Sequence, residues 1–137
     1  MISVLILAQE DFGKGLLHSV EHVLGKLPAG VELVGVDYNL PPENLIHTLK
    51  DRLARLDQGD GILILADVYG ASHTNIACRL LSRGHIQLVS GVNLPMLIRV
   101  LNYRNLSMDA LIAKAMTGGS EGIVCATNTL SKAETGR

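Results

Sequence analysis

Polar and charged side chains gather in the segment that follows the third apolar run of the chain. This run covers residues 62–66 and leads directly into Asp67, with Ser72 and His73 following after a glycine. A serine at a helix start accepts a hydrogen bond from the free amides there, and these amides also attract anions such as phosphate. A carboxylate in this place can orient a neighbouring nucleophile, as the third group of a catalytic triad does. The residue types therefore favour phosphate handling; the alternative is that Ser72 only caps a helix and Asp67 only shapes a turn.

The surrounding sequence indicates an α/β fold, because five short apolar runs alternate with longer stretches of helical pattern. The runs are apolar on both faces, which is typical of strands in a sheet that helices cover on both sides. We expect a three-layer α/β sandwich with a mainly parallel sheet of about five strands. The predicted strands are residues 2–8, 31–37, 61–66, 86–89 and 122–126, and the predicted helices are residues 13–25, 42–57, 72–83 and 94–118, the last broken near residues 103–107.

The position of the site follows from this fold. In open α/β sheets, ligands bind beyond the carboxyl ends of the strands. That rule selects the loops at residues 9–13, 67–73 and 90–95. We expect residues 1–126 to form one domain, followed by a polar tail at residues 127–137 that frays or contacts another subunit.

Composition excludes several classes of function. The chain has 137 residues, 47% of them apolar, and a formal net charge of −1 without any block of like charge. Nucleic-acid binding normally needs a basic surface, so no nucleic-acid partner is expected. The first apolar run is far shorter than the roughly 20 residues that span a bilayer and lacks the flanks of a signal peptide, so we expect a cytoplasmic protein without direct membrane insertion. Cys78 and Cys125 lie in apolar segments and are predicted to be reduced and buried.

Two of the three selected loops carry longer motifs. Residues 65–77 read Leu-Ala-Asp-Val-Tyr-Gly-Ala-Ser-His-Thr-Asn-Ile-Ala, and residues 90–97 read Ser-Gly-Val-Asn-Leu-Pro-Met-Leu. The first resembles the signature of mannose-type IIA components of the bacterial sugar phosphotransferase system, in which an Asp ends the strand and a Gly-Gly-Ser/Thr-Pro-x-Asn turn follows. The second resembles the Gly-Val-Asn-x-Pro-Met segment of the same family. Further matches at Gly13, Gly25 and residues 119–122 extend the resemblance over residues 1–126.

This resemblance implies a role in sugar transport. IIA components of this type relay a phosphoryl group from a histidine-containing phosphocarrier protein to a IIB component, and they need no cofactor or metal. The resemblance also implies a homodimer that is built partly through the C-terminal strand.

Gln9 occupies the position at which the family carries its phosphate-accepting histidine. The family's turn is Thr-His-Gly, and alignment through Gly13 places residues 8–10, Ala-Gln-Glu, on it. Imidazole is nucleophilic at neutral pH, whereas the amide nitrogen of glutamine has its lone pair delocalised into the carbonyl group. Glu10 and Asp11 add negative charge that would repel a phosphoryl group. We therefore expect a degenerate acceptor site.

His73 is the candidate for a substitute acceptor, since it stands where the family usually has proline. The alternative, which we favour, is a tolerated polar residue in an exposed first helical turn. His18 and His22 match the H-x-x-E-H pattern of inverted zinc proteases, but helical geometry points both toward solvent and away from the buried face. No metal site is expected from them.

Three functions remain open at this point. The chain is a working IIA component, a catalytically inactive IIA-like protein that binds or regulates partners, or a receiver-like domain that is phosphorylated on aspartate. Glu10, Asp11, Asp67 and Ser90 imitate the receiver layout. The receiver's lysine is absent after the predicted fifth strand, which counts against this class.

Overall fold

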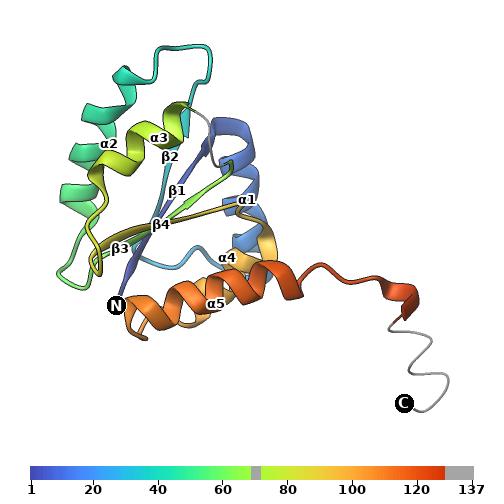
Figure 1. The fold of residues 1–137 in the computed structure, drawn as a ribbon. Coiled ribbons are helices and arrows are strands. Elements are labelled where there is room, and N and C mark those ends of the chain that lie inside the picture. Colours follow the sequence, from blue (N-terminus) through green and yellow to red (C-terminus); the bar gives the residue numbers. More distant parts are fainter. Residues whose placement is uncertain (69–71, 129–137) are drawn as a thin grey trace.

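The protein is built around a four-stranded sheet in which every neighbouring pair is parallel (Figure 1). The computed structural model describes residues 1–68 and 72–128. The strands are β1 (Ser3–Gln9), β2 (Val31–Val36), β3 (Ile62–Ala66) and β4 (Ile86–Ser90), in the order β2-β1-β3-β4. Because β1 and β3 are central, they are apolar and buried on both faces, as the sequence predicts.

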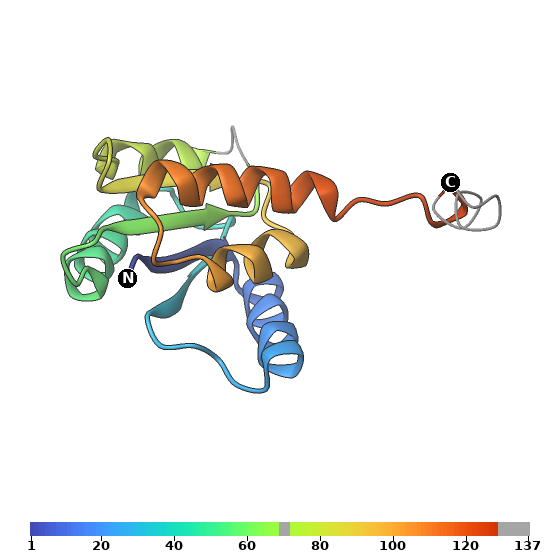
Figure 2. The same cartoon turned by 90° about the horizontal axis from the view of Figure 1, so that it is seen from below.

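Helices cover both faces of the sheet, which confirms the predicted three-layer α/β sandwich (Figure 2). Side chains of β1 alternate between the layers: Ile6 packs into one core cluster, and Leu5 and Leu7 pack into the other. The first layer holds α1 (Glu10–Leu24), α4 (Leu94–Asn102) and α5 (Met108–Glu121). The second holds α2 (Glu43–Leu56), α3 (Ser72–Ala77) and the 3-10 turn η1 (Cys78–Leu80).

The predicted fifth strand at residues 122–126 is wrong. Gly122 ends α5, and the chain then runs away from the sheet, irregular at residues 123–125 and helical at residues 126–128 (Figures 1 and 2). Ile123 is 79% exposed and Val124 is 62% exposed. The segment is apolar like a buried strand, but within one chain α5 carries it past the sheet, so no neighbouring strand can pair with it.

The cysteines are more exposed than the sequence predicts. Cys125 lies on the extended segment and is exposed, and Cys78 is only partly buried in η1. The prediction of two buried thiols is therefore wrong. For Cys125 it assumed that the surrounding segment belongs to the sheet, and for Cys78 it assumed a buried helical position, whereas η1 has no buried residue. Among the helices in the described ranges, none combines the length and apolarity needed to cross a bilayer.

A glycine in α1 sets the position of the helix whose first turn contributes to the site. Gly13 is buried against β2, and a Cβ atom there would lie 2.4 Å from Cδ1 of Leu33. Any side chain at this position would displace the side chain of Leu33, so the absence of a Cβ atom lets α1 approach β2 closely. The helix ends at Gly25, which adopts a left-handed conformation with φ 85°.

Candidate functional site

The carboxyl ends of β1, β2 and β3 bring Gln9, Tyr38 and Asp67 together at one edge of the sheet. Gln9 is the last residue of β1 and pairs in register with Val36 of β2. Asp67 directly follows β3, which pairs with the other side of β1. Tyr38 lies in the loop that follows β2. Parallel strands end on the same side, so three loops that are distant in sequence meet here.

The carboxylate of Asp67 connects these three loops. Its Oδ2 accepts a hydrogen bond from the backbone N–H of Gln9 at 2.9 Å. Its Oδ1 accepts from the backbone N–H of Val68 at 2.8 Å and from the hydroxyl of Tyr38 at 2.7 Å. Burial, the hydrogen bond to Asp67 and the negative charge of Asp67, in that order, raise the pKa of Tyr38 far above its ordinary value. The phenol therefore stays protonated and remains a hydrogen-bond donor at neutral pH.

Gln9 serves as a helix cap in this structure. Its side-chain Oε1 accepts a hydrogen bond from the backbone N–H of Phe12 at 2.9 Å, at the start of α1. This contact satisfies one of the free amides of the helix. The amide group of Gln9 is therefore occupied structurally, in addition to being chemically unable to carry phosphate.

Acidic side chains line the cavity beside Gln9. The cavity has a volume of about 360 Å³ and is lined by residues from α1, the end of β2 and the following loop, Glu10, Asp11, Asp37 and Tyr38 among them. Glu10 and Asp11 belong to the first turn of α1, where carboxylates are stabilised by the helix dipole. Lys14 lies 3.5 Å from Glu10 in an exposed pair that offsets little of the charge.

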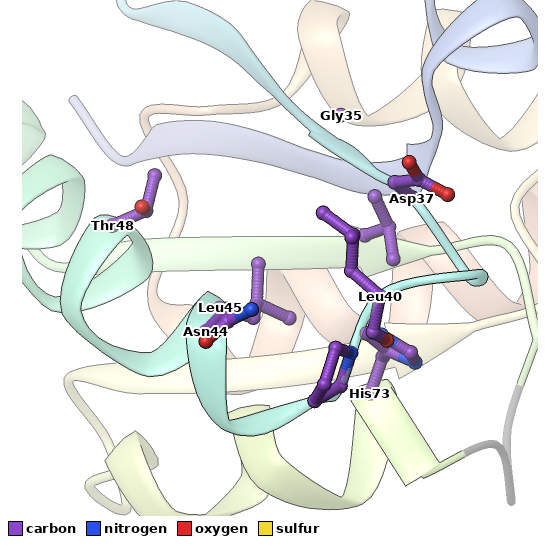
Figure 3. A pocket seen from close by; sticks show the side chains of 9 residues that line it. Gly35, Asp37, Leu40, Asn44, Leu45, Thr48 and His73 are labelled. Carbon is purple, nitrogen blue, oxygen red and sulfur yellow. The ribbon is translucent and has the colours of Figure 1, made fainter.

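His73 is buried, at 7% exposure, which makes the prediction of an exposed helical turn wrong. Its Nε2–H donates to the carbonyl oxygen of Leu40 at 3.0 Å, and its ring meets that of Tyr38 edge to face, with centroids 5.0 Å apart. The loop after β2 folds over His73 and removes it from solvent. His73 lines a second cavity of about 180 Å³, and in Figure 3 Leu40 and His73 lie together at one end of it, with Thr48 at the other.

The remaining predicted residues have more limited roles. Ser72 is exposed and begins the six-residue α3, and the hydrogen bonds that join Asp67, Gln9 and Tyr38 do not pass through it. Residues 69–71 of the predicted loop lie outside the described residues. In the third loop, Asn93 caps α4 by accepting from the N–H of Met96 at 2.9 Å, and it also donates to the carbonyl oxygen of Gly119 at 3.2 Å. That motif therefore joins α4 to α5.

Tyr38 was not predicted from the sequence. The predicted site loops follow the first, third and fourth strands, whereas Tyr38 lies in the loop after the second. The same rule about carboxyl ends of strands points to that loop, and an aromatic residue with a hydroxyl two residues after β2 was the available signal. His18 and His22 are both exposed on α1, as predicted.

Comparison with known proteins places the chain in one family. The family model described as "PTS system fructose IIA component" matches residues 3–116. The mannose-specific EIIAB component of the phosphotransferase system of Escherichia coli K12 is 38% identical over 115 residues, which cover 79% of this chain and 34% of the relative. The protein of the same name from Shigella flexneri matches equally. The chain thus spans about a third of the length of these curated relatives.

Solved structures agree with this result. A phosphotransferase system component EIIA from Streptococcus agalactiae superimposes with a TM-score of 0.81 at 26% identity, covering 93% of this chain and 99% of the other. A putative phosphotransferase system permease from Klebsiella pneumoniae gives a TM-score of 0.76 at 28% identity, covering 93% of each chain. These matches favour the IIA interpretation over the receiver-like one. The chain therefore belongs to the mannose/fructose-type IIA family of the bacterial sugar phosphotransferase system.

Proposed function

We propose that this IIA protein binds the partner proteins of the phosphotransferase system without accepting phosphate at residue 9, and so acts as a regulatory relative of the phosphate-relaying components. The proposal rests on the side chain of Gln9, which caps α1 by accepting a hydrogen bond from the backbone N–H of Phe12. The carboxylate of Asp67, which could orient a nucleophile, is instead bonded to three donors of the protein itself. The site is therefore internally satisfied, and an acidic rim surrounds it.

Exposed apolar side chains around the site support the binding role. Phe12 follows Gln9, Val68 follows Asp67, and Leu40 lies in the loop held by His73; each is about half exposed. Large apolar groups that stay in water at one edge of a protein often mark an interaction surface. Together with the carboxylates of Glu10 and Asp11 they suit a partner with an apolar centre and a basic rim, in this family the phosphocarrier protein or a IIB component.

A phosphotransfer assay tests the proposal. The protein is incubated with phosphoenolpyruvate, its phosphotransferase enzyme and the phosphocarrier protein, and its intact mass is measured under conditions that preserve phosphohistidine. We expect no phosphate on the unmodified chain, and in particular none on His73, because its Nε2 is bonded to Leu40 in a buried position. Stoichiometric phosphate on any residue would contradict the proposal. A phosphate lost on His73→Ala would identify that residue as a substitute acceptor.

A binding experiment tests the proposed surface. Phe12→Asp places a charge among the exposed apolar groups and should weaken binding of the phosphocarrier or IIB protein by about tenfold or more, as loss of an interface anchor does. Val23→Asp is the matched control, because Val23 is an equally exposed apolar residue near the other end of α1. Binding can be measured by titration calorimetry. Equal affinities of the two variants would show that the partner binds elsewhere.

We also propose a homodimer in which residues 122–128 of each copy lie along β4 of the other. β4 is an edge strand of the sheet. An open groove of about 820 Å³ runs beside it, lined by apolar side chains that include Leu88, Ile112 and Met116. Ser82 bridges the outer edge of β4 at Ile86, and the rest of this edge beside an apolar groove favours pairing with another chain. Ile123 lines the groove in its own chain, and Val124 next to it is exposed and has an apolar side chain that can enter the groove of the partner. We expect this assembly in the cytoplasm, where its proposed partners act.

A further inference from the structure

The hydrogen bond between Tyr38 and Asp67 affects the carboxylate that would assist phosphate transfer to a nucleophile at residue 9. Both groups lie at the edge of the sheet where β1 ends at Gln9. Oδ1 of Asp67 already serves two donors, the hydroxyl of Tyr38 at 2.7 Å and the N–H of Val68 at 2.8 Å. Oδ2 accepts from the backbone of Gln9 and is thus directed toward the residue that aligns with the family's acceptor. Any nucleophile at residue 9 would meet a carboxylate that is partly satisfied.

We propose that Tyr38 is a positioning residue that opposes phosphate transfer at this site in addition to the loss of the acceptor histidine. Its hydrogen bond lowers the capacity of Asp67 to stabilise a positively charged nucleophile at residue 9. The inference rests on the proposed function, since it concerns the same phosphotransfer site. Transfer to an imidazole forms a P–N bond at one ring nitrogen while the bond between phosphorus and the donor breaks, and the ring gains positive charge. A carboxylate facing the other ring N–H stabilises that charge. Each hydrogen bond donated to the carboxylate disperses its negative charge and weakens this effect.

The surroundings of Tyr38 keep its hydroxyl on Asp67. The ring of Tyr38 packs edge to face on His73, with an interplanar angle of 80°. His73 is itself fixed, because it is buried and its Nε2–H donates to the carbonyl oxygen of Leu40, in the same loop as Tyr38. The loop is therefore attached to the site by two hydrogen bonds and an aromatic contact. The raised pKa of Tyr38 also keeps its phenol protonated, so Tyr38 donates a hydrogen bond to Asp67 across the neutral pH range.

The test introduces an imidazole at residue 9 and then removes the hydroxyl group of Tyr38. The variants are Gln9→His, Gln9→His with Tyr38→Phe, and Gln9→His with Tyr103→Phe. The last is a matched control, because Tyr103 is an exposed tyrosine in the α4–α5 connection whose ring contacts Lys114. Two quantities are measured: the pKa of the introduced imidazole by NMR titration, and the initial rate of phosphate uptake from the phosphorylated carrier.

We expect Tyr38→Phe to raise the pKa of the introduced imidazole by about half a unit and the rate of phosphate uptake by about fivefold, as removal of one hydrogen bond from a charged acceptor implies. Tyr103→Phe should change neither quantity. A role of Tyr38 in structure alone would lower the rate and leave the pKa unchanged or lower it, because a loosened loop leaves Asp67 less well oriented.

The outcomes separate this inference from the proposed function. An unchanged or lowered imidazole pKa in the Tyr38→Phe variant overturns the inference, as does an equal rise caused by Tyr103→Phe. If none of the three imidazole variants takes up phosphate, the NMR titration decides alone. Phosphate uptake by the unmodified chain contradicts the proposed function whatever the titration shows. If Gln9→His takes up phosphate fully and Tyr38→Phe has no effect, the proposed function still holds, but Tyr38 does not influence phosphate transfer at this site.

Discussion

Replacing Val124 with aspartate should dissociate the proposed homodimer into monomers. Val124 is 62% exposed in the single chain, on a segment that leaves the sheet after α5 (Figure 1). In the proposed dimer this side chain enters the groove beside β4 of the partner, whose lining residues are uncharged, so an aspartate there would have to lose its hydration without a counter-ion. Each dimer loses two buried aliphatic anchors, each worth about 1.5–3 kcal/mol, and also has to bury two charges, so the dimer Kd should rise by about 100-fold or more.

Light scattering coupled to size-exclusion chromatography measures this effect over a range of protein concentrations. Val23→Asp is the control, because it puts the same charge on an equally exposed apolar residue of α1, away from the groove. The control should remain dimeric. If the Val124→Asp variant stays dimeric as well, residues 122–128 do not form the interface. A mass of one chain for the unmodified protein at all concentrations would contradict the dimer itself.

The sheet and its helices could be predicted from the sequence because their physical signals are local. A strand between two helical layers must be apolar on both faces, and residues 62–66 show this pattern without interruption. The break between the last two helices was also predictable, since the polar residues near 103–107 interrupt the apolar periodicity; α4 ends at Asn102 and α5 begins at Met108. The helix predicted over residues 72–83 is shorter, with α3 ending at Ala77 before the 3-10 turn.

The features that the sequence did not predict depend on contacts between distant segments. An apolar stretch at residues 122–126 has the composition of a strand, but whether it pairs depends on which neighbour α5 leaves within reach. The burial of His73 depends on Leu40, 33 positions earlier, and the role of Tyr38 depends on a carboxylate 29 positions later. Residue types in one loop cannot show that another loop folds over them. The proposed loss of the acceptor at Gln9, by contrast, concerns the chemistry of a single side chain, so it can be inferred from the sequence without any contact between distant segments.

Replacing Gly61 with alanine should lower the stability of the protein more than the same substitution at the neighbouring Gly59. Gly61 precedes β3 with φ +92°, and a Cβ atom there would lie 2.4 Å from the carbonyl oxygen of His85. That oxygen accepts the N–H of Ile62 at 2.8 Å, the contact that starts the pairing of β3 with β4, so the backbone cannot move aside without breaking it. Positive φ costs an alanine roughly 1–2 kcal/mol, and overpacking typically adds about 1–3 kcal/mol.

Gly59→Ala separates these two contributions. Gly59 lies in the same turn with φ +103°, and its Cβ would meet no atom within 4 Å. Equilibrium unfolding in urea should therefore show a loss of about 1–2 kcal/mol for Gly59→Ala, from backbone strain alone, and about 3–4 kcal/mol for Gly61→Ala. Equal losses would mean that β3 and β4 can separate at this end without penalty. Because Asp67 directly follows β3, the stability of this strand also fixes the carboxylate that joins the loops of the site.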